Sequence, residues 1–354
     1  MPRPLQLQMP AVRRWVTEHI ATSGHALSRS MADTFGVTRA AVAPLLHRLE
    51  AEGFIVRTRA GTRPAFAAGP SRFIEQRLPL PGVDESAVWE TMFSPWLDLR
   101  PNVANIVHYG LTEMLNNAND HSDGHVVVAR CAVAAGVVYL SVCDDGVGVF
   151  ERMRRGLDLP DVRLAPLELS KGRVTTDPQR HTGEGIFFTS RAFPLFRVQA
   201  NGLRYDRRNR ELDTLGQGRA PLQLPPDPEL PGSRVSMALR TDSTQQLRGI
   251  FEAFTTGAPD DLSFDRTVVP VRLGRVGLDN LLSRSQARRV MAGLERFRRV
   301  ELDFEGVDEV GQAFADEVFR VWASAHPDVD LRAIHAQPGV RAMLQRAAGN
   351  TGQR

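Results

Sequence analysis

Residues 106–148, IVHYGLTEMLNNANDHSDGHVVVARCAVAAGVVYLSVCDDGVG, decide the expected fold of the middle of the chain. Apolar side chains recur at helical spacing from Ile106 to Ala118, which predicts a helix with one buried face. Two β-branched runs at 126–128 and 137–142 flank an Ala-Ala-Gly turn and predict a hairpin. The hairpin ends in the sequence CDDGVG. A carboxylate-bearing helix packed on such a hairpin predicts a site for a nucleotide and its metal.

Two further motifs follow in order, HTGEGI at 181–186 and GSRVSMAL at 232–239. Together with residues 106–148 they resemble the N box, the two glycine boxes and the last strand of the GHKL (Bergerat-fold) ATPases. DNA gyrase, histidine kinases and anti-sigma-factor kinases share this fold. The resemblance implies an ATP-binding α/β sandwich, which we place at residues 82–242.

The resemblance also implies roles for individual residues. Asn117 would coordinate Mg2+, and Glu113, one helical turn earlier on the same face, would polarise the attacking water or hydroxyl. Asp145 would accept the adenine amino group, with Asp144 as the alternative if the register is shifted by one residue. The other expected nucleotide-binding residues are Gly146 and Gly148 in the first glycine box, Gly183 and Gly185 in the second, and Ser233.

The polar segment between Val149 and Thr182 corresponds to the mobile ATP lid of that family. It contains Lys171, the only lysine in the chain. A compact ammonium suits a phosphate, so we expect Lys171 to neutralise the γ-phosphate, with Arg173 and Arg180 as alternatives and chance as the other explanation of its uniqueness.

Residues 8–76 are expected to form a separate, basic domain. The stretch Met1–Arg77 holds eleven arginines and five acidic residues, so it carries +6, whereas the whole chain carries +3. Its pattern predicts a helix, a short strand at Ala26–Ser28, two helices around a Gly36 turn and an alternating hairpin, and it resembles a winged helix-turn-helix. The expected contacts to duplex DNA are Arg39, His47 and Arg48 in the second helix of the motif and Arg57, Arg59 and Arg63 in the wing. The alternative is a winged helix that makes only protein contacts.

Residues 77–100 are expected to be a linker and the first helix of the ATPase domain. After the ATPase domain, patterns of strands and helices alternate through residues 258–350, which predicts a small α/β domain. The run VELDFEGVDEV at 300–310 followed by a helix resembles the STAS fold of anti-anti-sigma factors. Those proteins are phosphorylated on a hydroxyl at the helix start, but here Gly311, Gln312 and Ala313 offer none. We therefore expect a docking or dimerisation surface, used by a partner protein or a second copy of the chain.

The 354 residues are thus expected to form a multidomain α+β protein with a winged helix, a GHKL α/β sandwich and a small STAS-like α/β domain. No long apolar run or signal peptide is apparent, so we expect a cytoplasmic protein without a membrane segment. The first functional hypothesis is a regulator that binds ATP and Mg2+, hydrolyses ATP and couples nucleotide state to DNA binding. The alternatives are an anti-sigma-type serine kinase acting on a separate partner, and a defence or signalling ATPase triggered by DNA.

Overall fold

The computed structural model describes residues 9–60, 63–134, 136–172, 183–208, 228–255, 263–275 and 281–349. Within it the chain forms two compact units. The first comprises Met1–Gly148, Phe193–Ala200 and Asp206–Thr244, and the second Val149–Ala192, Asn201–Tyr205 and Gln245–Arg354. The segment between the two glycine boxes therefore groups with the C-terminal residues.

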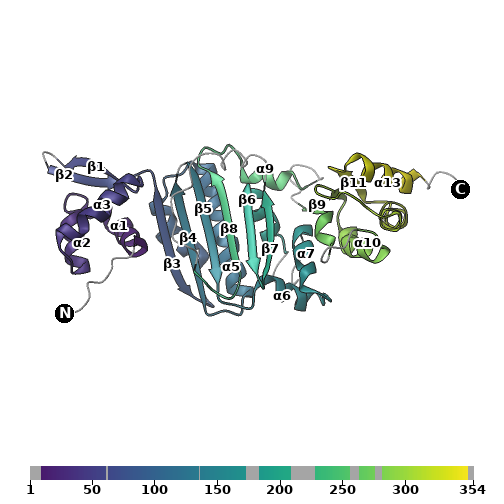
Figure 1. Cartoon of the computed structure of the whole chain (residues 1–354), viewed down its shortest axis with the longest axis horizontal. Helices are drawn as coiled ribbons and strands as arrows, with labels where there is room; N and C mark the ends of the chain where they lie inside the picture. Colours follow the sequence, from purple (N-terminus) through teal and green to yellow (C-terminus); the bar gives the residue numbers. More distant parts are fainter. Residues whose placement is uncertain are drawn as a thin grey trace. The chain divides into compact units, whose positions relative to one another are not determined.

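The first unit begins with three helices and a hairpin (Figure 1): α1 (Met9–Ser23), α2 (Leu27–Phe35), α3 (Arg39–Ala51), β1 (Ile55–Ala60) and β2 (Arg63–Ala68). Gly36, at φ 64°, ends α2, and the Thr38 side chain caps α3 by accepting from the Ala41 N–H at 3.3 Å. The expected strand at 26–28 is wrong, because α2 already starts at Leu27. Helix–hairpin packing buries a common apolar core that includes Val12, Met31 and Leu49.

The hairpin is followed by a six-stranded sheet with the order β3-β4-β5-β8-β6-β7. Its strands are β3 (Arg72–Pro79), β4 (Val126–Ala134), β5 (Val137–Asp144), β6 (Leu195–Ala200), β7 (Leu203–Arg208) and β8 (Arg234–Arg240). The expected hairpin is formed by β4 and β5, paired antiparallel. β3 pairs antiparallel with β4, so residues that we assigned to the end of the N-terminal domain form an edge strand of this sheet.

One long helix, α5 (Pro101–His121), covers one face of the sheet (Figure 1). Ile106, Val107, Leu111 and Leu115 on its inner face are fully buried, as the apolar spacing predicts. Short helical segments precede it: α4 (Glu85–Val88), η1 (Trp89–Phe93) and η2 (Ser94–Trp96).

The second unit contains a three-stranded parallel sheet of order β11-β10-β9, with β9 (Arg266–Pro270), β10 (Arg299–Asp303) and β11 (Asp330–Ile334). Its helical segments from the C-terminal stretch are α9 (Leu247–Glu252), η5 (Val271–Gly274), α10 (Arg284–Met291), η6 (Leu294–Arg296), α11 (Gln312–Asp316), η7 (Glu317–Trp322), α12 (Ala323–Ala325) and α13 (Pro338–Gly349). The expected alternation of strands and helices is confirmed.

Four further segments of the second unit come from the stretch around the second glycine box: α6 (Val149–Gly156), η3 (Val162–Leu164), α7 (Ala165–Lys171) and α8 (Gly185–Ala192). Phe187 and Phe188 of α8 pack against Phe264, with ring centroids 4.4 and 5.0 Å apart. Helix α8 therefore shares an aromatic core with the residues that lead into β9.

Candidate functional site

The polar face of α5 carries Glu113 and Asn117, one turn apart and both half-buried. Burial raises the pKa of Glu113, and the nearby Glu85 carboxylate raises it further. The Nδ2 atom of Asn117 is buried and has no hydrogen-bond partner among the described residues. A buried polar atom without a partner costs about 1–3 kcal/mol, so it marks a place where an incoming ligand restores a bond. Rotation of the amide by about 180° would present the oxygen that a hard cation prefers.

The raised pKa of Glu113 leads to a stability prediction. A carboxyl group whose folded-state pKa is raised favours folding most when protonated, and this contribution is lost as the pH rises through the folded pKa. Glu113→Gln mimics the protonated form. We expect it to raise Tm relative to the parent protein near pH 8, and to leave Tm unchanged near pH 3.5, below the ordinary carboxyl pKa of about 4.3. Thermal unfolding of both proteins across this range measures the difference, and an equal offset at both ends would show that Glu113 does not titrate as described.

Asp144 ends β5 and is 5% exposed. Its Oδ1 accepts from the backbone N–H of Gly146 at 2.9 Å and of Ser233 at 3.2 Å, and its own N–H donates to the Ser233 carbonyl at 3.0 Å. Burial raises the pKa of Asp144, while hydrogen bonds from Ser233 and Gly146 limit the rise. Asp144, Gly146 and Ser233 therefore form one cluster, made by segments about 90 residues apart in sequence.

The backbone around this cluster is closely packed. A Cβ atom at Gly232 would overlap the Oδ1 of Asp144, and one at Gly146 would overlap the carbonyl of Ser122. The Ser122 carbonyl also accepts from Val147 at 2.8 Å. Only glycine permits this approach of three chain segments, so Gly146 of the first box and Gly232 before the last strand together shape the surroundings of Asp144.

Asp145 has a different role in the structure. Its Oδ1 accepts from the backbone N–H of His125 at 2.7 Å and of Val126 at 2.8 Å, at the start of β4. Burial acts to raise the pKa of Asp145, but these hydrogen bonds lower it. Asp145 is thus engaged at the start of β4, whereas Asp144, the alternative register, lies with Ser233. The spacing Asp-x-Gly-x-Gly, counted from Asp144, was the sequence signal for this register.

The other glycines that we expected to bind the nucleotide are divided between the two units. Gly148, at φ 83°, ends the first glycine box in the first unit, whereas Gly183, at φ 72°, and Gly185, the first residue of α8, belong to the second unit. His181, Thr182, Arg173 and Arg180 lie outside the described residues.

Lys171 differs from its expected role. Its side chain is fully buried, and its Nζ donates to Glu168 Oε1 at 2.7 Å, the Ala292 carbonyl at 2.9 Å and the Arg289 carbonyl at 3.0 Å. An ammonium has three N–H donors, so none is left for a phosphate in this structure. The single lysine thus occupies a buried cation site with three separate acceptors, a geometry that suits a compact ammonium better than a planar guanidinium.

The expected DNA contacts divide into exposed and paired side chains. Arg39, His47 and Arg59 are exposed. Arg48 and Arg57 are also on the surface, but Arg48 pairs with Glu52 at 3.0 Å and Arg57 with Glu50 at 2.8 Å. The side chain of Arg63 is not among those that the structure describes. Binding to a phosphate would require Arg48 and Arg57 to exchange their carboxylate partners, so Arg39, His47 and Arg59 are the side chains available without rearrangement.

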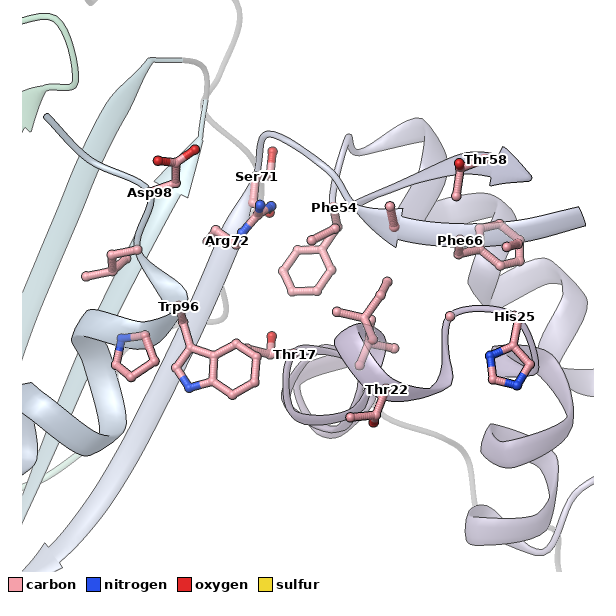
Figure 2. A pocket seen from close by; sticks show the side chains of 18 of the residues that line it. Thr17, Thr22, His25, Phe54, Thr58, Phe66, Ser71, Arg72, Trp96 and Asp98 are labelled. Carbon is pink, nitrogen blue, oxygen red and sulfur yellow. The ribbon is translucent and has the colours of Figure 1, made fainter. Parts of the chain in front are cut away.

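A pocket of about 650 Å³ lies between α1, the β1–β2 hairpin and the segment that leads into α5. Figure 2 shows Thr17, Phe54 and Trp96 toward its middle and His25 at one end. It shares no lining residue with the cluster around Asp144, so it is a separate cavity.

The arrangement defines a protein of mixed α/β class with an antiparallel and a parallel sheet in separate units. Residues 286–341, from α10 into α13, match the family described as a STAS-like domain of unknown function (DUF4325), which confirms the STAS-like character of the C-terminal part. No curated protein matches the chain. Among the described residues, no helix combines the length and apolarity needed to cross a membrane.

Proposed function

We propose that the first unit binds ATP with Mg2+ and that the chain hydrolyses it. The observation that carries this proposal is the unpartnered, buried amide end of Asn117, one turn after a carboxyl group whose pKa is raised. The glycine-lined cluster around Asp144 in the same unit supports it. In this proposal Asp144 accepts the adenine amino group with Ser233 beside it, Asn117 holds Mg2+, and Glu113 takes a proton from the attacking water. Mg2+ would supply charge neutralisation between the phosphates.

We further propose that the N-terminal helices and hairpin act as a winged helix-turn-helix on duplex DNA. The support is the position of Arg39 and His47 on the exposed side of α3, with Arg59 on the neighbouring hairpin. The exposed α3 residues between them, Ala40, Ala41, Ala43 and Pro44, have short side chains. On this face mainly the two longer polar side chains can therefore reach base edges or phosphates.

The STAS-like part would then dock a protein partner or a second copy of the chain. In this part, Gly311 precedes α11, and the helix starts with Gln312 and Ala313. None of these three residues has a hydroxyl group that could accept a phosphoryl group. The second candidate function is an anti-sigma-type serine kinase that acts on a separate partner protein. Transfer of labelled γ-phosphate to a partner protein would select the kinase, whereas release of free phosphate would select the ATP-hydrolysing regulator.

The coupling between DNA and nucleotide is tested by binding a labelled duplex pool at two salt concentrations, with and without a non-hydrolysable ATP analogue. We expect affinity that falls steeply with salt and shifts with the nucleotide, because a ligand moves an equilibrium only through differential affinity. Arg39→Ala should weaken binding to all sequences and lower the salt slope by about one phosphate contact. Arg346→Ala, an exposed arginine in α13, is the matched control. Salt-independent binding, or none in either nucleotide state, would leave the N-terminal part as a protein-contact module.

A further inference from the structure

The pocket of about 650 Å³ combines a largely apolar lining with charged groups. Its lining residues come from α1, the β1–β2 hairpin, the start of β3 and the segment Pro95–Asp98, all within the first unit. Val16 and Phe54 are buried there and supply apolar side chains. The lining residues His25 and Thr58 are exposed, so the pocket opens to solvent. A cavity of this size is typical of a small-molecule site.

Hydrogen bonds between the walls hold the pocket open. The backbone N–H of Phe66, in β2, donates to the carbonyl of Gly24, just after α1, at 2.9 Å. A Cβ atom at Gly24 would overlap the Phe66 carbonyl, so a side chain at this position would push the hairpin away from α1. The hydroxyl of Thr17, in α1, donates to the carbonyl of Phe73, in β3, at 3.1 Å. Because these walls are fixed in advance, a ligand would lose little free energy in ordering them.

Aromatic side chains lie at the middle of the pocket. Figure 2 shows the rings of Phe54 and Trp96 there, carried by segments far apart in sequence. Phe54 is buried and Trp96 is half-buried. A flat aromatic ring packs well against such side chains, either stacked or edge to face, and displaces water from an apolar surface. The middle of the pocket therefore favours a ligand that carries an aromatic ring.

A half-buried guanidinium lies at one end of the pocket, where Figure 2 shows Arg72 near Ser71 and Asp98. Nη1 of Arg72 donates to the Ser71 carbonyl at 3.0 Å, and no described carboxylate lies at ion-pair distance from it. A guanidinium has five N–H donors in a planar fork, so others are left for a carboxylate. Burial lowers the pKa of Arg72, and the charge of Asp98 acts against this. With Arg59, the lining holds two guanidinium groups and one carboxylate, a balance that favours a ligand with a single negative charge.

We propose that this pocket binds a small aromatic monocarboxylate, with its carboxylate on Arg72 and its ring packed against Phe54 and Trp96. The pocket shares no lining residue with the cluster around Asp144, so this ligand is distinct from the proposed nucleotide and its binding does not depend on the proposed function. Charge is recognised at one end and the ring in the middle. Substitutions at the two places should therefore have different effects.

The test measures binding of cinnamate and of its neutral analogue cinnamamide to the full chain by calorimetry. We expect the parent protein to bind cinnamate at least about tenfold more tightly, because hydrogen bonds between charged groups are stronger than those to a neutral amide. Arg72→Gln should abolish this preference and leave the affinity for cinnamamide nearly unchanged. Arg77→Gln is the matched control, because Arg77 is an exposed arginine of the same strand outside the pocket lining, and this variant should keep the preference.

A second variant tests the contact with the ring. Trp96→Leu should weaken the binding of cinnamate and cinnamamide by similar factors and keep the preference for the carboxylate, because it removes only an aromatic contact. A preference that survives in folded Arg72→Gln protein would overturn the proposal, and so would unchanged binding of both compounds by folded Trp96→Leu protein. The proposal also fails if the parent protein binds the two compounds equally, or if it binds no cinnamate up to millimolar concentration.

Discussion

Asp144→Asn is expected to weaken ATP binding by roughly 30- to 100-fold, the equivalent of about 2–3 kcal/mol. The change turns one carboxylate oxygen into an N–H donor beside the N–H groups of Gly146 and Ser233, which already donate to this side chain. It also removes the negative charge that favours an amino group over other edges of a base. Calorimetric titration with ATP and Mg2+ measures the loss, and a preserved circular dichroism spectrum shows that the fold remains.

The matched control for this prediction is Asp145→Asn. Asp145 accepts from two N–H groups at the start of β4, so its replacement should lower Tm while nucleotide affinity changes by less than about threefold. The opposite result, with binding lost in Asp145→Asn and kept in Asp144→Asn, would restore the register in which Asp145 contacts the base.

Glu113→Gln is expected to bind ATP with nearly unchanged affinity and to lose turnover by about 10²- to 10⁴-fold, the usual contribution of a general base. The amide keeps the shape of the side chain but cannot accept a proton from water. Burial raises the pKa of Glu113, which makes its carboxylate a stronger base than an exposed glutamate. Phosphate release under saturating ATP measures turnover. The Asn117→Ala protein should differ from the Glu113→Gln protein, because it should lose Mg2+-dependent ATP binding itself.

An exposed glutamate provides the control for Glu113. Glu90→Gln makes the same chemical change at Glu90, in η1. The turnover of the Glu90→Gln protein should match that of the parent protein. Normal hydrolysis by Glu113→Gln would remove Glu113 from the mechanism, and the proton would then have to pass to another group.

Local sequence signals predicted the helices and strands that have strong periodicity. The 3.6-residue apolar rhythm of α5 and the two β-branched runs of β4 and β5 each encode one buried face, so neighbours along the chain suffice to recognise them. The alternating strands and helices of the C-terminal part were likewise recognised from patterns within single segments. The residues of β3 up to position 76 were assigned to the N-terminal domain and the rest to a linker, because nothing in Arg72–Pro79 says which strand they will pair with.

The sequence alone determined the alternation of strands and helices in the C-terminal part and the residues that form the polar face of α5, because these follow from spacing within single segments. The STAS-like character of the C-terminal part came from a resemblance, which the family match supports. The tertiary structure decided which of two adjacent aspartates joins Ser233 and where the single lysine lies. Both outcomes depend on partners distant in sequence: Ser233 is brought to Asp144 by the pairing of β5 with β8, and the α10 carbonyls meet Lys171 only after two helices dock. Hydrogen bonds between residues distant in sequence depend on packing, and no local pattern specifies their partners.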